Sequence, residues 1–136
     1  MSDQFPLGLT GEARIQVTQE VTARHMGSGA VLVFATPEMV RLMERAAVNA
    51  LAPHLAPAQQ SVGTMVNVRH LAATPLGATV TARAELIAVD GRRLTFRVSA
   101  HDGTELIGEG THERTLIDLA RFEAKVAAKA AHSSQD

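Results

Sequence analysis

Apolar and polar residues alternate along most of the chain, and one long stretch follows a helical period instead. Residues 12–21 alternate with a period of two, which predicts a half-buried strand. Residues 25–29 hold two glycines around a serine and predict a flexible loop, and residues 30–35 form a short apolar run that predicts an extended entry into the next element. From residue 36 the apolar positions recur at about 100° per residue, so a helix is expected to begin there.

The predicted helix has a broad apolar arc, which indicates that the rest of the fold largely encloses it. Thr36 suits the N-cap, because its hydroxyl can accept a backbone N–H of the first turn, and Pro37 suits the first helical position. Pro53 and Pro57 end the helix. The arc consists of Met39, Val40, Leu42, Met43, Ala46, Ala47, Ala50 and Leu51. The opposite side consists of Glu38, Arg41, Arg45 and Asn49.

The second half of the chain is a series of alternating segments, which predicts consecutive strands. The predicted strands are residues 62–72, 79–89, 93–101 and 105–117. Asp90-Gly91 and Asp102-Gly103 are typical of tight hairpin turns between them. The alternation places one set of residues on a common face of the first of these strands: Val62, Thr64, Val66, Val68, His70 and Ala72. Apolar residues at helical spacing then predict a terminal helix that ends at about residue 130.

The order of strand, helix and antiparallel strands indicates an α+β fold. A long central helix wrapped by such an antiparallel β-sheet is the hot-dog fold, and residues 1–136 are expected to form a single domain of this kind. Residues 1–10 and 131–136 are expected to be flexible. One sheet with one central helix leaves much apolar surface uncovered, so we expect a homodimer or a dimer of dimers.

Composition and charge exclude several classes of function. The net charge is -1 and the chain has no Trp or Tyr, so it lacks both the basic excess and the stacking residues expected of a nucleic-acid binder. It has no cysteine, which excludes disulfides, cysteine-ligated zinc, iron–sulfur clusters and a thiol nucleophile. The histidines show no metal-ligand spacing, and we find no membrane-spanning apolar run and no signal peptide. We therefore expect a cytoplasmic protein without a metal or other cofactor.

Four residues stand out as candidates for chemistry. Glu44 lies at the margin of the helix arc, where a carboxylate either leans out to pair with Arg41 or acts as a base or nucleophile at the edge of a pocket. His70 shares a strand face with valines, either as a core histidine or as a proton shuttle at a pocket wall. Thr36 either only caps the helix or also holds or attacks a substrate carbonyl at its positive end. Gly63 either starts its strand or permits close approach of a ligand.

Four longer segments carry a specific resemblance to a known family. They are FATPEMVRLME at residues 34–44, GTMVNVRHLAATP at 63–75, DGRRLTFRVSAHDG at 90–103 and GEGTHER at 108–114. These segments resemble those of the fluoroacetyl-CoA thioesterase-like family of hot-dog thioesterases, and the resemblance spans roughly residues 31–126. Such a span without an obvious gap is far more specific than a short motif.

This resemblance implies an acyl-CoA thioesterase that hydrolyses a small acyl-CoA to a carboxylic acid and CoA, with CoA as part of the substrate. It places the family's catalytic threonine, glutamate and histidine on Thr36, Glu44 and His70, and its substrate-contacting glycine on Gly63. The pantetheine arm is then expected along a subunit boundary. The candidates for binding the phosphates are Arg69, Arg92, Arg93 and Arg97. For Arg93 and Arg97 the alternative is a solvated outer face of the sheet.

The resemblance leaves the details of the reaction open. Glu44 either activates water or attacks directly, His70 donates a proton or positions the water, and Thr36 either attacks or forms a hydrogen bond. Before residue 31 the family is richer in Phe and in acidic residues, and the Phe rings shape a lid over the acyl group. The corresponding residues 25–30 of this chain form a small and flexible stretch. We therefore expect the chemistry without the fluorine selectivity. Two alternatives remain, a non-catalytic acyl-CoA-binding module and an acyl-thioester hydratase or dehydratase.

Overall fold

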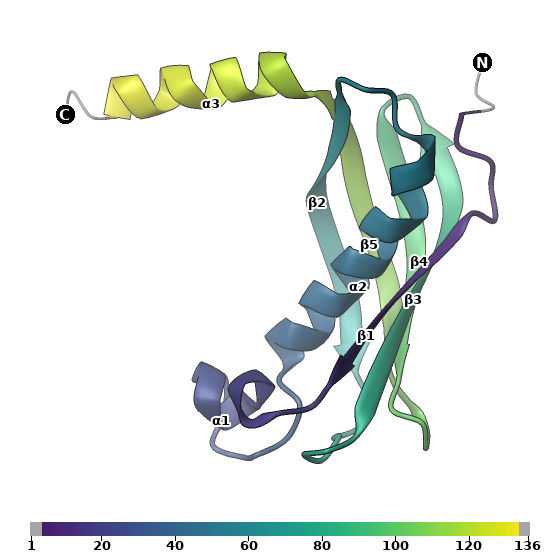
Figure 1. The fold of residues 1–136 in the computed structure, drawn as a ribbon, viewed down its shortest axis with the longest axis vertical. Helices are drawn as coiled ribbons and strands as arrows, with labels where there is room; N and C mark the ends of the chain where they lie inside the picture. Colours follow the sequence, from purple (N-terminus) through teal and green to yellow (C-terminus); the bar gives the residue numbers. More distant parts are fainter. Residues whose placement is uncertain (1–3, 134–136) are drawn as a thin grey trace.

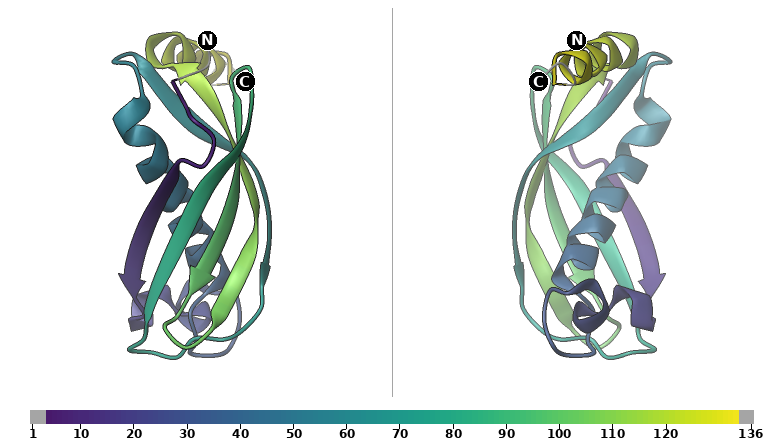
Figure 2. Two further views of the ribbon diagram at one scale, coloured as in Figure 1. Left: turned by 90° about the vertical axis from the view of Figure 1, so that its right-hand side faces the viewer. Right: turned by 90° about the vertical axis from the view of Figure 1, so that its left-hand side faces the viewer.

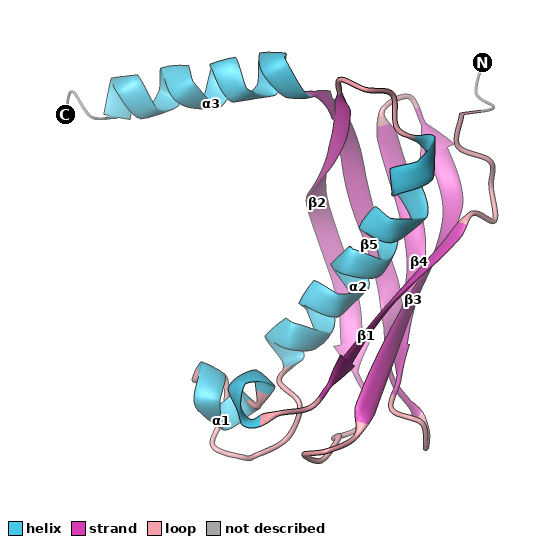
Figure 3. Ribbon diagram, in the orientation of Figure 1, coloured by secondary structure: helices cyan, strands magenta, loops and turns pink. Residues whose placement is uncertain are grey.

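The computed structural model describes residues 4–133, in which a curled antiparallel sheet holds one long helix in its concave face (Figures 1 and 2). The strands are β1 (Thr10–Gln16), β2 (Gln59–His70), β3 (Thr79–Asp90), β4 (Arg93–His101) and β5 (Leu106–Asp118). The helices are α1 (Ala23–Met26), α2 (Thr36–Leu51) and α3 (Leu119–Ser133), with 3-10 turns at Gln19–Val21 and Ala52–His54. Figure 3 separates the helices from the strands, and the arrangement confirms the expected α+β class and hot-dog fold.

The described strands form a single sheet in the order β1-β3-β4-β5-β2. Strands β3, β4 and β5 follow one another through the two predicted hairpin turns, in which Gly91 and Gly103 have φ angles of 62° and 90°. A residue with a Cβ atom is strained at such positive φ angles, so these tight turns favour glycine. β2 pairs with β5 on one side only, so within the described residues its other edge is unpaired.

The core forms between α2 and the inner face of the sheet. The predicted arc of α2 is buried except for Val40, which is half-buried. The inward residues of β3 and β4 pack against it, namely Val80, Ala82, Ala84, Leu86, Leu94, Phe96, Val98 and Ala100. Val48 is 39% exposed on the same helix. One side of α2 is therefore uncovered in the single chain, where the sequence predicted an enclosed helix.

The prediction that Thr36 is the N-cap of α2 is wrong. Ala35 holds that position with extended backbone angles, and no side chain makes a cap hydrogen bond there. Thr36 is the first helical residue, and its hydroxyl contacts the ring of His70 instead of a backbone N–H of the first turn.

Glu38, which the pattern puts on the side of α2 opposite the apolar arc, is covered by another part of the chain. Glu38 is buried, because β1 runs along that side of the helix and Ala13 and Ile15 line the same hollow. Its carboxylate Oε2 lies 3.5 Å from Nη1 of Arg41, which is exposed. A half-exposed ion pair of this kind contributes little to stability, so the strand that covers Glu38 decides its environment.

A β-bulge between Gly63 and Met65 interrupts the alternation predicted for β2. The extra residue changes the phase of the strand, so the residues before the bulge are out of phase with those after it. The residues that keep the predicted face with His70 are Val66 and Val68. The residues wrongly placed on that face are Val62 and Thr64, and the hydroxyl of the latter lies 3.2 Å from that of Thr115 on the outer face.

The two ends of the described chain differ. Phe5 is buried and the backbone N–H of Gly8 donates to the carbonyl of Leu86 at 2.8 Å, so the segment before β1 packs against β3, where the sequence predicted flexibility. Helix α3 extends the predicted terminal helix to Ser133 and projects away from the sheet (Figure 1). None of its described residues is buried. The outermost parts of the segments expected to be flexible, residues 1–3 and 134–136, lie outside the described residues.

Strand β1 passes so close to α2 that Gly11 has no room for a side chain. A Cβ atom there would overlap the backbone carbonyl oxygen of Ala46 and the backbone nitrogen of Ala50. Backbone atoms cannot move aside as a flexible side chain can, so Gly11→Ala is expected to destabilise the fold by about 3 kcal/mol. Urea unfolding followed by circular dichroism measures this loss. Thr10→Ala, at the exposed neighbouring position, is the control, and equal stability of the two variants would contradict the close approach.

Candidate functional site

Thr36 and His70 meet where the start of α2 lies against the end of β2. The Oγ1 of Thr36 lies 2.7 Å from the Nδ1 of His70, within hydrogen-bond distance. An isolated bridge between Val33 and Pro75 holds the extended segment that leads into α2. The first residue of a helix and the last residue of a strand are thus held together, and the predicted pair of threonine and histidine is in contact.

His70 presents its second ring nitrogen to the surroundings of the pair. Its Nε2 is buried and makes no hydrogen bond within the described residues. Burial lowers the pKa of His70 below the usual value for histidine, and a backbone hydrogen bond at Ala72 acts in the opposite direction. Burial therefore favours the neutral form of the ring. One nitrogen contacts Thr36, and the other is available to a bound molecule.

A cavity of about 340 Å³ opens beside this pair. Helix α1 and the segment after it form one wall, and they lie beside the start of α2 (Figures 1 and 2). Together with Thr36 and His70, the lining residues are Ala23, Ser28, Val33, Phe34, Leu71, Ala72 and Ala73. The predicted loop at residues 25–29 is in part the end of α1, which Gly27 closes at a φ of 76°. The lining suits a small, mostly apolar group with its polar atoms toward Thr36 and His70.

Glu44 belongs to a second polar group further along α2. Its Oε2 would lie 2.9 Å from a Cβ atom built on Gly63, and the Nη1 of Arg114 and the Cε1 of His112 would each lie 3.3 Å from the same atom. The missing side chain of Gly63 therefore leaves the space in which these three groups meet. Glu44 is half-buried, at the edge of the interior.

Arg114 and His112 are functional candidates that the sequence reasoning missed. Arg114 is buried, and its pKa is lowered by that burial while the charge of Glu44 acts to raise it. His112 is 1% exposed, and burial lowers its pKa as well. Both side chains lie on the inward face of β5, in alternation with exposed or half-buried residues. The signal that could have found them is two polar side chains at inward positions of a strand, since buried polar groups need partners.

The two polar groups are separate within one chain. Thr36 and Glu44 are eight positions apart on α2, which corresponds to roughly 12 Å along the helix axis. Glu44 does not line the cavity beside Thr36 and His70. The structure brings Thr36 to His70 and Glu44 to Gly63. The expected convergence of Thr36, Glu44 and His70 on one cavity is not reached inside a single chain.

The arginines expected to bind phosphates are exposed. Arg69 is exposed on β2. Arg93 lies 3.0 Å from the Oδ2 of Asp90, and Arg97 lies 3.3 Å from the Oε1 of Glu85, in each case between exposed side chains. Such surface pairs agree with the alternative of a solvated outer face for these two residues. Phosphate binding by the arginines stays a prediction.

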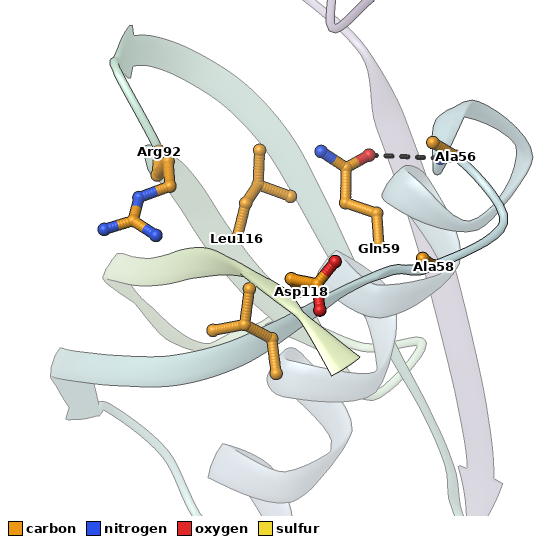
Figure 4. A pocket seen from close by; sticks show the side chains of 7 residues that line it. Ala56, Ala58, Gln59, Arg92, Leu116 and Asp118 are labelled. Carbon is orange, nitrogen blue, oxygen red and sulfur yellow. Dashed lines mark hydrogen bonds between the residues drawn. The ribbon is translucent and has the colours of Figure 1, made fainter. Parts of the chain in front are cut away.

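A second hollow of about 340 Å³ lies at the opposite end of β2 (Figure 4). Its lining residues are Ala56, Ala58, Gln59, Arg92, Leu116, Ile117 and Asp118. The Oε1 of Gln59 accepts a hydrogen bond of 3.1 Å from the backbone N–H of Ala56 at its edge. None of the predicted catalytic residues lines this hollow.

Two further properties concern cofactors and membranes. Across residues 4–133, no three or more His, Asp or Glu side chains are grouped so that they could hold a metal ion. No helix in the described part of the chain combines the length and apolar character that crossing a bilayer requires.

The chain is similar to thioesterases in sequence and in fold. Residues 17–120 match the family model described as "Fluoroacetyl-CoA-specific thioesterase". A fluoroacetyl-CoA thioesterase from Streptantibioticus cattleyicolor is 60% identical over 97 residues, which are 71% of this chain and 70% of that protein. The matched range contains Thr36, Glu44, Gly63 and His70.

Solved structures show the same similarity. A variant of the fluoroacetyl-CoA-specific thioesterase in complex with fluoroacetate and CoA is 49% identical, with a TM-score of 0.80 over 86% of this chain and 98% of that chain. A hypothetical protein of Thermus thermophilus, a thioesterase superfamily member, is 30% identical, with a TM-score of 0.91 over the full length of both chains. The polar groups described above therefore lie on a scaffold that thioesterases use.

Proposed function

This chain belongs to the fluoroacetyl-CoA-specific thioesterase family, and from that membership we propose that it hydrolyses small acyl-CoA thioesters to a carboxylic acid and free CoA. It is a thioester hydrolase, and CoA enters as part of the substrate. The observation that carries the proposal for this chain is the 2.7 Å contact of Thr36 with His70 beside a cavity of about 340 Å³. A cytoplasmic location, expected from the cysteine-free composition, stays a prediction.

The reaction divides among the three predicted catalytic residues. Glu44 removes a proton from the water whose oxygen adds to the thioester carbonyl carbon, or its own oxygen adds to give an anhydride that water then hydrolyses. The carbon–sulfur bond breaks, and CoA leaves as a thiolate that takes up the proton released when water adds, while the neutral His70 ring positions that water. Thr36 stands at the positive end of α2, where its hydroxyl and the helix dipole stabilise the negative charge that develops on the carbonyl oxygen.

A second copy of the chain would join the two separate polar groups into one site. The unpaired edge of β2 is a template for antiparallel pairing with another β2, and a two-fold axis near its middle would put the His70 end of one strand beside the Gly63 part of the other. Thr36 and His70 would then face the partner's Glu44. The 43% exposure of Val66 on β2, and the absence of any buried residue in α3, support a partner on this side. We therefore propose a homodimer, or a dimer of such dimers, with its sites at the boundary.

The acyl pocket of this chain is proposed to be less selective than the name of the family implies. The wall formed by α1 and the segment after it contributes Ala23 and Ser28, which are small residues. Small side chains leave room for acyl groups of different shape, and a pocket discriminates against one atom only through contacts that fit it closely. We expect acetyl, propionyl and other short groups to be accepted along with fluoroacetyl.

A panel of acyl-CoAs tests the proposed function. Release of free thiol is followed for acetyl-, fluoroacetyl-, propionyl-, butyryl- and octanoyl-CoA, and the short chains are expected to react fastest, with fluoroacetyl within about tenfold of acetyl. Crotonyl-CoA is included, because loss of its enoyl absorbance without thiol release would reveal a hydratase. Binding of CoA esters without thiol release from any of them would show a binding module and overturn the proposal.

A further inference from the structure

The hydrogen bonds of His112 fix both its charge and its tautomer. Its Nδ1 lies 2.8 Å from the backbone oxygen of Met65, and because a carbonyl only accepts, Nδ1 carries the proton. Its Nε2 lies 3.2 Å from the Nη1 of Arg114, and because a guanidinium only donates, Nε2 is the acceptor. The ring is 1% exposed and lies beside Phe96, with 6.5 Å between the ring centroids. His112 is therefore a neutral, buried acceptor for an arginine.

Arg114 is held from two sides. Its Nε donates to the Oγ of Ser61 at 2.8 Å, and its Nη2 donates to the backbone oxygen of Ser61 at 3.0 Å. With the bond to His112, these contacts fix the plane of the guanidinium, whose Nη1 would lie 3.3 Å from a Cβ atom built on Gly63, the same atom that would lie 2.9 Å from the Oε2 of Glu44. The position of the positive charge beside Glu44 therefore depends on an acceptor contributed by His112.

We propose that His112 is a positioning residue for Glu44, which holds the Arg114 guanidinium where its positive charge stabilises the Glu44 carboxylate. The inference rests on the proposed function, in which Glu44 reacts with water or substrate. His112 acts through Arg114 and does not touch the substrate. Its second bond, to Met65, ties the same ring to the β-bulge next to Gly63, so the acceptor is fixed relative to the backbone that borders the site.

Two substitutions separate the two bonds of His112. Asparagine keeps an N–H near the position of Nδ1 but has no acceptor at the position of Nε2, whereas glutamine places its amide oxygen near Nε2 and loses the donor to Met65. His112→Asn is expected to lower kcat for the best acyl-CoA about tenfold or more, with KM changed less than about twofold. His112→Gln is expected to recover most of the wild-type kcat. His101→Asn, the same change at an exposed histidine, is the matched control.

Every outcome of this comparison decides the proposal. Loss of kcat in His112→Gln with retention in His112→Asn would mean that the bond to Met65 matters and the bond to Arg114 does not. Unchanged kcat in both variants would also overturn the proposal, although the wild type would still be a thioesterase. If His112→Asn fails to fold, the kcat of His112→Gln alone decides, with circular dichroism to confirm its fold. Absence of thiol release by the wild type would instead mean that the proposed function has failed.

The dependence of stability on pH gives a second readout of the neutral ring. Burial lowers the pKa of His112, the bond to Met65 raises it, Arg114 lowers it, and Glu44 and Glu113 raise it, with a net shift downward from about 6.5. The unfolded chain then binds more protons, so this stability is full above about pH 6.5 and is lost as pH falls through the pKa of the folded state. His112→Gln removes this titrating group, so the Tm of the variant is expected to fall less than that of the wild type between pH 7.5 and 5.5. The pKa of His70 is lowered too, so part of the fall remains in the variant. Equal slopes would contradict a neutral His112.

Discussion

Glu44→Gln is expected to reduce kcat for acyl-CoA hydrolysis about a thousandfold or more, with little change in KM or in the fold. Glutamine has the size of glutamate and fills the same space beside Gly63, but it can neither take a proton from water nor attack the carbonyl carbon. The measurement is thiol release from the best substrate of the panel, together with a thermal unfolding curve. The loss should be confined to the chemical step, because Glu44 acts on the reacting atoms.

A second carboxylate on the same helix supplies the control. Glu38 is buried, whereas Glu44 is half-buried, and Glu38 pairs with Arg41 and belongs to neither polar group. Glu38→Gln is expected to keep kcat within about threefold of the wild type, since it removes a weak ion pair only. If Glu44→Gln retains activity comparable to that of Glu38→Gln, Glu44 has no part in the reaction.

Mixing two inactive variants is expected to restore activity. His70→Ala and Glu44→Ala each disable both sites of a homodimer if His70 and Glu44 come from different subunits. In a mixed dimer one site carries both lesions and the other carries none, so the purified mixed dimer should have about half of the wild-type activity per dimer. The variants are co-expressed with different affinity tags, the mixed dimer is purified through both tags, and thiol release is compared with that of each variant alone.

The result distinguishes two arrangements of the site. If His70 and Glu44 of the same chain served one site, every site in the mixed dimer would lack one of them and activity would stay at the level of the single variants. That outcome, with a dimer confirmed by light scattering, would contradict the site at the boundary while leaving the thioesterase activity in place. The control is a mixed dimer of His70→Ala with Thr36→Ala, which should remain inactive because the two residues are in contact within one chain.

Local pattern predicts the elements of this fold well, because a strand with one buried face must alternate. The structure also confirms two kinds of local signal besides alternation. These are the hairpins at Asp90-Gly91 and Asp102-Gly103 and the buried arc of α2. The exceptions arise where a distant segment decides the environment. Glu38 is on the polar side of its helix and is nevertheless buried, because β1 covers it. Thr36 is of a residue type that is favoured at helix N-caps, but its hydroxyl contacts His70, which is 34 positions later in the chain.

The candidate site is predicted in part, and the missing part has a physical reason. Thr36, Glu44, Gly63 and His70 stand out from the pattern and from the family resemblance, and the structure places each of them in a polar group. They divide into two groups because Thr36 and Glu44 are far apart along the axis of α2. Which strand residue each of them meets is known only once β2 is placed beside the helix. Arg114 and His112 are recognised only when the inward face of β5 is known to meet Glu44.

The bulge in β2 has a consequence for how the length of that strand can change. From Gly63 to His70 is seven positions, an odd number, and residues an odd number apart in a regular strand point to opposite faces. The additional residue between Gly63 and Met65 restores both to the same side of the sheet. Deleting or inserting one residue between them would turn either the glycine or the histidine outward. Related enzymes that need both residues can therefore vary this segment only in steps of two.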